Sequence, residues 1–193
     1  KENDQALQNI YLMSEKNYYP MNMKVKEIFD WTKNFYPDFD MEYAKKLADI
    51  FELNINKNVK SLSTGYNSIF KVIIALSVNT PYVLLDEPVL GLDANHRDVF
   101  YRLLIEKYSN SPSTIVISTH LIEEVSTVIE DVIIIKKGSI IKNESREDLL
   151  SQGYTISGKA SSVDSFIVDK NVIGIGTIGG LKSAFILGNI DKD

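Results

Sequence analysis

Two adjacent carboxylates follow an apolar run in the middle of the chain. Asp86 and Glu87 come directly after residues 82–85, which are predicted to form a buried strand. The carboxyl ends of strands form the edge at which open α/β sheets bind ligands. At that edge Asp86 could hold Mg²⁺, and Glu87 could orient or deprotonate a water that attacks a phosphate. Taken alone, the pair is equally compatible with a strand end capped by solvated acids.

Two other features would add to such a site. Residues 114–119 are predicted to form a second strand, and if it runs parallel to the first, His120 emerges at the same edge. Its imidazole could then donate to a terminal phosphate oxygen. Residues 62–66 begin a helix, where free backbone N–H groups and the Ser63 hydroxyl would form an anion site. Taken separately, His120 could be a histidine without a functional role, and residues 62–66 could be an ordinary helix N-cap.

Hydrophobic periodicity predicts a helical region ahead of the two carboxylates. Within residues 24–51, apolar side chains recur at helical spacing on one face, and these are Ala44, Leu47, Ala48 and Phe51. Ser63 is expected to cap the next helix. The apolar side chains of that helix imply burial on most sides until residues 79–81 stop it.

Short apolar runs predict the sheet that carries the two carboxylates. A strand at residues 10–13 precedes the helical region. Further runs lie at residues 82–85, 114–117 and 132–135, and the helical stretches between them lie at residues 95–107 and 121–129. Near-continuous apolar runs are typical of strands covered on both faces. The alternation of strand and helix predicts an α/β fold with a parallel sheet.

The C-terminal part has a different texture. Residues 136–141 are expected to form a hairpin, and Ser145 to cap a last short helix. From residue 151 we predict a small accessory subdomain with strands and one helix. Its Gly-x-Gly-x-x-Gly stretch at residues 174–179 is followed by only fourteen residues, too few for a dinucleotide-binding unit. A glycine-rich turn is the favoured interpretation.

Composition limits the classes of function. The chain has 193 residues, a formal net charge of −5 and 44% hydrophobic residues, which is typical of a globular protein. The acidic balance lacks the basic footprint of a nucleic-acid-binding protein. There is no cysteine and there are only two histidines, so thiolate chemistry is excluded and a histidine-based metal centre is not favoured. The apolar runs are far shorter than the ~20 residues that cross a bilayer.

Four motifs in order resemble the nucleotide-binding subunit of ATP-binding cassette (ABC) transporters. Leu-Ser-Thr-Gly-Tyr at 62–66 resembles the Leu-Ser-Gly-Gly-Gln signature, and residues 82–88 resemble the Walker B strand with its catalytic glutamate. Gly-Leu-Asp at 91–93 resembles the D-loop, and Ser-Thr-His at 118–120 resembles the segment with the switch histidine. Glu15 stands where the family's Q-loop usually has glutamine, and Thr64 and Tyr66 depart from the signature. The resemblance covers roughly residues 5 to 150.

The resemblance implies a partial P-loop NTPase sheet with a helical subdomain at about 24–78 in a domain of residues 1–150, plus a small α+β appendage at residues 151–193. It also implies ATP and Mg²⁺, with Asp86 and Glu15 near the metal. By the same resemblance Glu87 activates water and His120 senses the γ-phosphate. The signature residues Ser63, Thr64 and Gly65 would contact ATP held by a second ABC ATPase subunit, identical or different, and Asp93 would link the two sites.

A membrane partner is implied as well. In the family, the coupling helix of a transmembrane permease subunit contacts the loop at Glu15 and the helical region. We therefore expect a cytoplasmic protein, peripheral on the inner face of the cell membrane. Residues 61–66, 89–95 and 153–158 resemble bacterial exporters of antibiotics or peptide toxins.

No Gly-x-x-x-x-Gly-Lys-Ser/Thr loop occurs in the chain. The family places this loop before the Q-loop, so the chain resembles a cassette truncated at its N-terminus, and this piece alone is expected to bind ATP poorly and to be inactive as an ATPase. Two alternatives remain open. One is a non-transport ABC ATPase acting on ribosomes or DNA, although no tandem cassette, coiled coil or basic arm is present. The other is a non-enzymatic dimerising or regulatory fragment.

Overall fold

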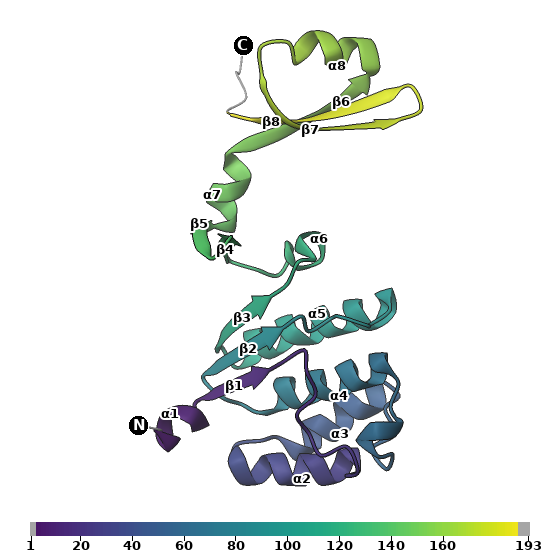
Figure 1. The fold of residues 1–193 in the computed structure, drawn as a ribbon, viewed down its shortest axis with the longest axis vertical. Helices are drawn as coiled ribbons and strands as arrows, with labels where there is room; N and C mark the ends of the chain where they lie inside the picture. The colour runs from purple at the N-terminus through teal and green to yellow at the C-terminus, as the bar shows by residue number, and fades with distance from the viewer. Residues whose placement is uncertain (1–2, 189–193) are drawn as a thin grey trace. The chain divides into compact units, whose positions relative to one another are not determined.

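The computed structural model describes residues 3–188, and the chain separates into two compact units, residues 1–122 and residues 123–193. In the first unit a run of helices separates the first two strands of the sheet, and one helix separates the second strand from the third (Figure 1). In order the elements are α1 (Asp4–Gln8), β1 (Ile10–Met13), α2 (Val25–Phe35), α3 (Met41–Ile50), a 3-10 turn (Val59–Ser61), α4 (Thr64–Ser77), β2 (Tyr82–Asp86), α5 (Ala94–Asn110) and β3 (Thr114–Ser118). The strands form one parallel sheet in the order β1-β2-β3. The parallel sheet is therefore confirmed for these three strands.

The two faces of this sheet differ. Successive side chains of a strand point to opposite faces, and in β1 Tyr11 and Met13 are buried on the face toward α4. On the other face Leu12 is 60% exposed, and Val116 of β3 is exposed as well. The predicted burial of the strands on both faces is thus wrong, because the side chains of the second face lie open within the described residues.

Aromatic side chains hold the helical region of the first unit together. The rings of Phe29 in α2 and Phe70 in α4 are stacked with their centroids 6.4 Å apart, and Tyr19 meets Phe70 edge-on at 5.0 Å. Phe29 and Phe70 are fully buried. The predicted cap of α4 is confirmed, since the Ser63 hydroxyl accepts a hydrogen bond from the backbone N–H of Tyr66 at 3.3 Å.

The helix predicted at residues 121–129 is shorter than expected. α6 (Ile122–Val125) begins at the last residue of the first unit and has only four residues. The Ser126 hydroxyl donates to the backbone carbonyl of Glu123 at 2.9 Å, and the guanidinium of Arg146 donates to the carbonyl of Ser126. These side-chain bonds occupy carbonyls that a longer helix would use within its own backbone.

The strand predicted at 132–135 does not join the parallel sheet. It is β4 (Asp131–Lys136), which pairs antiparallel with β5 (Ser139–Ser145) in a two-stranded sheet of the second unit. The predicted hairpin is confirmed. Lys137 and Gly138 at its turn both have positive φ, 50° and 78°, as a tight two-residue hairpin turn requires. Because of this tight turn, β4 pairs with β5, the strand that follows it directly in the sequence.

The rest of the second unit is a small three-stranded sheet with two short helices. Its elements are α7 (Arg146–Ser151), β6 (Gly153–Lys159), α8 (Ala160–Phe166), β7 (Asn171–Ile178) and β8 (Leu181–Leu187). The antiparallel order is β6-β8-β7, and Val163 of α8 is buried together with Ala184 and Ile186 of β8. The predicted glycine-rich turn is wrong for residues 174–178, which form the second half of β7 and pair with β8; only Gly179 lies in the turn. The domain boundary after residue 150 stays a prediction. Among the helices of residues 3–188, none is both long and apolar enough to cross a membrane.

Candidate active site

The parallel sheet brings the predicted chemical residues to one edge. Met13 at the end of β1 lies level with Leu85, and Asp86 at the end of β2 lies level with Ser118 at the end of β3. Glu15, Glu87 and His120 follow these three strand ends. Asp86, Glu87 and His120 therefore lie at the carboxyl edge of the sheet, and Glu15 lies two residues beyond the end of the neighbouring strand β1.

Glu87 has an unusual backbone conformation. Its φ is +46°, in the left-handed region that residues other than glycine rarely adopt. Its N–H still donates to the carbonyl of Ser118 at 2.8 Å, so the pairing of β2 with β3 continues one residue beyond β2. The left-handed residue then turns the chain away from the sheet, and the backbone N–H of Leu90 closes the turn on the carbonyl of Glu87 at 3.1 Å. Such strain at a candidate catalytic residue is a recognised sign of a functional site.

The Glu87 carboxylate accepts three hydrogen bonds from the end of β3. Thr119 Oγ1 donates to Oε2 at 2.9 Å, while the backbone N–H of His120 and its ring Nδ1 contact Oε1 at 3.1 Å and 2.8 Å. Burial raises the pKa of Glu87, but the hydrogen bonds from His120 and Thr119 outweigh it and hold the pKa below its usual value. The Glu87 side chain is only 18% exposed, whereas that of His120 is 68% exposed. The carboxylate is thus held in place while the imidazole faces solvent.

The helix start at residues 62–66 lies against the turn that follows Glu87. A Cβ on Gly65 would come within 2.9 Å of the backbone oxygen of Gly91, so the two segments approach as closely as a glycine allows. One turn further along α4, the Ser68 hydroxyl donates to the carbonyl of Leu90 at 2.7 Å. The signature-like residues and the D-loop-like residues are therefore packed together within this chain.

Asp93 is the N-cap of α5. One carboxylate oxygen accepts from the backbone N–H of His96 at 2.9 Å, and the other lies 2.9 Å from His96 Nδ1. The bond from the His96 backbone is the largest cause that lowers the pKa of Asp93. The contact of both Asp93 carboxylate oxygens with His96 was not predicted from the sequence.

The oxygen donors at the sheet edge fit one kind of metal binding. No group of three or more histidine, cysteine, aspartate or glutamate side chains in the described ranges is placed to hold a metal ion. Mg²⁺, however, is usually bound by one or two carboxylates together with substrate phosphates and water. Asp86, the last residue of β2, and Glu15, two residues after the neighbouring strand β1, could supply such carboxylates.

Lys71 is a residue of this region that sequence reasoning missed. It lies in α4 and is only 7% exposed, and its ammonium donates to the backbone carbonyls of Ser14 and Glu15 at 3.0 Å and 2.7 Å. A single charge inside the apolar stretch of residues 69–76 was the available signal. Thr119 was noted only as part of a motif, and its bond to Glu87 was not foreseen.

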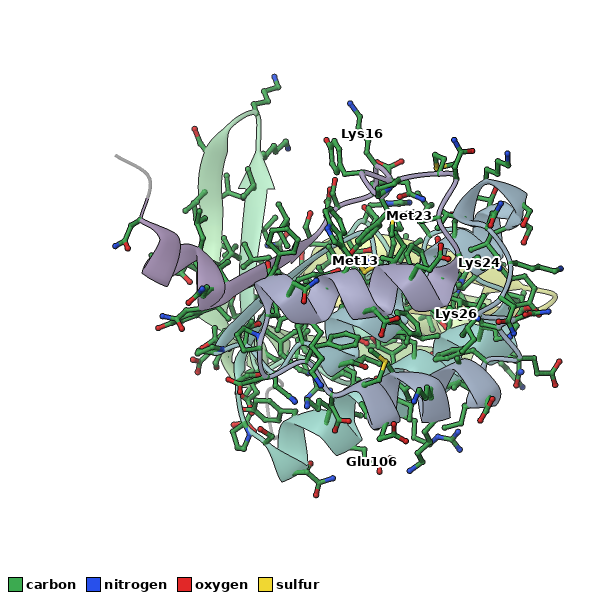
Figure 2. The ribbon with its side chains drawn as sticks, turned by 90° about the horizontal axis from the view of Figure 1, so that it is seen from below. Met13, Lys16, Met23, Lys24, Lys26 and Glu106 are labelled. Atoms are coloured by element: carbon green, nitrogen blue, oxygen red, sulfur yellow. The ribbon has the colours of Figure 1, made fainter. Side chains whose placement is uncertain are left out.

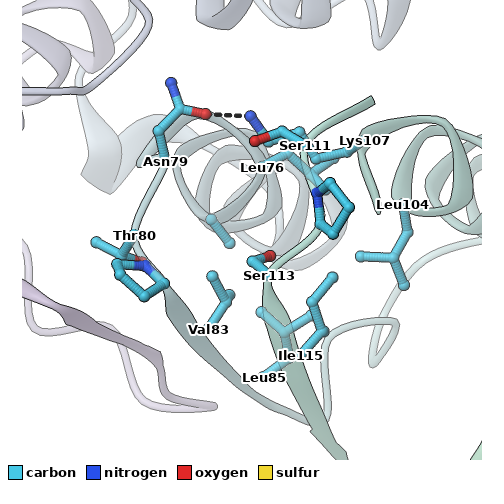
Figure 3. Close-up of a pocket in the computed structure, with 13 residues that line it drawn as sticks. Leu76, Asn79, Thr80, Val83, Leu85, Leu104, Lys107, Ser111, Ser113 and Ile115 are labelled. Atoms are coloured by element: carbon cyan, nitrogen blue, oxygen red, sulfur yellow. Dashed lines mark hydrogen bonds between the residues drawn. The ribbon is translucent and has the colours of Figure 1, made fainter. Parts of the chain in front are cut away.

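Two cavities of the first unit are large enough to consider, and Glu87, Thr119 and His120 line neither of them. One, of about 260 Å³, lies at the opposite end of the sheet beside the residues that precede β2 and β3, including Pro81 and Ser113, where Asn79 and Lys107 are hydrogen-bonded (Figure 3). The other, of about 310 Å³, lies between β1, the loop after it and α2, and aromatic side chains dominate its lining. Figure 2 shows Met13 of this region behind α2 and Lys16 extending outward.

Comparison with known proteins gives a consistent picture. No protein-family model matches the chain. It is 28% identical over 125 residues to the ABC transporter ATP-binding protein YtrB of Bacillus subtilis, and 28% identical over 131 residues to the energy-coupling factor transporter ATP-binding protein EcfA2 of Staphylococcus aureus. These matches cover 65% and 64% of this chain but 43% and 45% of the relatives. The chain is a relative of ABC transporter ATP-binding proteins.

A solved structure of the ATP-binding subunit of an ABC transporter superimposes with a TM-score of 0.69 at 18% identity, covering 76% of this chain and 62% of that one. This likeness confirms the α/β fold of the ABC ATPases. The chain spans less than half the length of the two curated relatives. The roles of the individual ABC-like residues stay predictions.

Proposed function

We propose that the chain is part of an ATP-binding and ATP-hydrolysing subunit of an ABC transporter. The observation that carries the proposal is the cluster of Glu87, Thr119 and His120 beside Asp86 at the carboxyl edge of the sheet. A carboxylate held by three donors at a strand edge is suited to orienting a water for attack on a phosphate. The relationship to ABC ATP-binding proteins supports the same reaction.

In the proposed mechanism each residue has a distinct part. Bound Mg²⁺ would neutralise phosphate charge, with Asp86 and Glu15 as its protein neighbours. Glu87 is a carboxylate at neutral pH, and its lowered pKa favours this form further, so it can accept a hydrogen bond from the attacking water and orient it. His120 donates from Nδ1 to Glu87, and in the imidazolium form its second ring nitrogen would carry an N–H that can donate to the γ-phosphate.

The composite site requires a second ABC ATPase subunit, identical or different. Ser63, Thr64 and Gly65 would contact the ATP held by that subunit, and Asp93 would link the two sites. The N–H groups at the start of α4, a helix of fourteen residues, are suited to a phosphate. The first turns of α4 pack against the turn that follows Glu87. This packing supports a direct connection between contact with the second subunit's ATP and hydrolysis at Glu87.

A transmembrane permease subunit is the proposed membrane partner. The aromatic cavity beside Glu15 and α2 is a hydrophobic recess of the kind that accepts a side chain from a partner helix. Such docking would place the chain on the cytoplasmic side of the membrane, peripheral to it. Export of a peptide, toxin or antibiotic is the transport reaction that the motif resemblances favour.

The chain lacks a phosphate-binding loop, and one face of its sheet carries exposed apolar side chains. We infer that a preceding segment of a longer protein supplies the loop and covers that face, and that these 193 residues alone are inactive. Calorimetric titration of the chain with Mg-ATP is expected to give no binding. Saturable binding abolished by Asp86→Ala would show that this inference is wrong.

The hydrolytic role is tested by Glu87→Gln in the full-length protein. The variant is expected to bind Mg-ATP, to lose most of its turnover and to accumulate as an ATP-bound dimer. Glu106→Gln, an exposed glutamate on α5, is the matched control and should leave turnover unchanged. Unchanged binding and turnover in Glu87→Gln would instead favour a non-enzymatic dimerising or regulatory role.

A further inference from the structure

Lys71 occupies a position where a lysine is costly. It lies on α4 between Phe70 and Val72, both fully buried, and is itself almost completely buried. A buried ammonium requires partners, since lysine is almost never fully buried unless it is paired. The Lys71 ammonium must therefore be stabilised by other groups at this buried position.

The partners of Lys71 are two consecutive carbonyls of the loop after β1. Its Nζ donates to Ser14 O at 3.0 Å and to Glu15 O at 2.7 Å. These bonds connect segments more than fifty residues apart in the sequence. They fix the backbone at Glu15 to the helix whose first residues resemble the ABC signature.

The charge of Lys71 also acts on the sheet edge. Burial lowers the pKa of Lys71, while the nearby carboxylates of Glu15 and Asp86 act in the opposite direction. The ammonium is thus a positive charge close to these two carboxylates. It also reduces the negative potential that a triphosphate would meet there.

We propose that Lys71 is a positioning residue that anchors the loop at Glu15 to α4 and offsets the negative charge of the Glu15 carboxylate. Glu15 stands where a neutral glutamine is usual in the ABC family, so its carboxylate adds a negative charge beside the substrate. The buried ammonium supplies the compensating charge from within the same unit. The anchoring stands on the hydrogen bonds alone, while the effect on ATP rests on the proposed function.

Anchoring is tested without nucleotide, by trypsin digestion of the full-length protein. Lys16 is exposed, so cleavage after it requires only that the anchored loop open locally. Lys71→Met is expected to speed this cleavage roughly ten-fold, because hydrogen bonds to a charged donor are lost. Cleavage after Lys137, in the hairpin turn of the second unit, is the internal control and should keep its rate. Equal rates after Lys16 in both proteins would overturn the anchoring.

Charge compensation is tested by a double-mutant cycle on the KM for Mg-ATP of the full-length protein. In the protein that keeps Glu15, Lys71→Met should raise KM several-fold. In a Glu15→Gln background, the factor by which Lys71→Met raises KM should be smaller by at least about three-fold. Lys16→Met removes the same charge from an exposed neighbouring position and should show no such coupling. Equal effects of Lys71→Met in both backgrounds would overturn the compensation.

A further variant covers the case in which Lys71→Met does not fold. Lys71→Gln keeps one neutral donor and no charge, so it should slow loop cleavage relative to methionine but raise KM as methionine does. An unchanged KM in a folded Lys71→Gln would overturn the compensation. If the unaltered protein shows no ATP turnover, the proposed function fails, while the trypsin result still decides the anchoring.

Discussion

Replacing His120 by alanine tests the geometry of the Glu87 cluster directly. The change removes the ring bond of 2.8 Å to Glu87 Oε1 and leaves the bonds from Thr119 and from the backbone of residue 120. Burial, which raises the pKa of Glu87, then meets less opposition. The pKa of Glu87 should therefore rise in His120→Ala.

The cost in stability is small because the imidazole is 68% exposed. A hydrogen bond to a charged group contributes about 1.5–3 kcal/mol when shielded, and solvent screening reduces this to about 1 kcal/mol or less. The pKa of Glu87 is lower in the folded than in the unfolded chain, so this stabilisation is present at neutral pH. It is lost as the pH falls below the ordinary pKa of a glutamate and through the lowered pKa of the folded state.

Two measurements check these expectations. Carboxyl NMR titration of Glu87 reports its pKa, and urea unfolding at neutral and acidic pH reports the stability. Trp31 is the only tryptophan of the chain and lies in α2, so its fluorescence follows the first unit alone. The reasoning is refuted if His120→Ala leaves the pKa of Glu87 unchanged, or if it costs as much stability in a Glu87→Gln background as in the original protein.

Two further predictions concern packing. Gly65→Ala should destabilise the first unit by about 1–3 kcal/mol, because its Cβ would meet the backbone oxygen of Gly91 at 2.9 Å; Gly176→Ala, with open space around its Cβ, is the control. Phe70→Ala should cost about 3–5 kcal/mol in urea unfolding, whereas Phe166→Ala at a half-exposed position should cost far less, and similar costs would contradict the assignment of the core.

The sheet edge could be predicted from the sequence because its information is local. Each of the strands β1, β2 and β3 is a short apolar run, and parallel pairing then brings the residues after them together. The cap at Ser63 and the turn at Lys137 and Gly138 were equally accessible, since they depend on residue types at adjacent positions.

The remaining features depend on tertiary contacts that periodicity does not encode. The apolar run of β4 looks the same as that of β2, yet its partner is the adjacent strand β5 rather than the parallel sheet. Lys71 looks like an interruption of an apolar helix until the carbonyls of Ser14 and Glu15 are placed beside it. The conformation of Glu87 is likewise set by the turn that follows it.

That conformation restricts what can replace Glu87 before any chemistry is considered. At φ +46° a β-branched side chain clashes with its own backbone, whereas asparagine, aspartate and glycine fit well. A saturation library at this position would therefore separate into two groups. Valine, isoleucine and threonine would be lost through misfolding of the turn, while asparagine and glycine would give folded proteins without the carboxylate. Only the second group reports on catalysis, so the choice of substitution decides whether an inactive variant is informative.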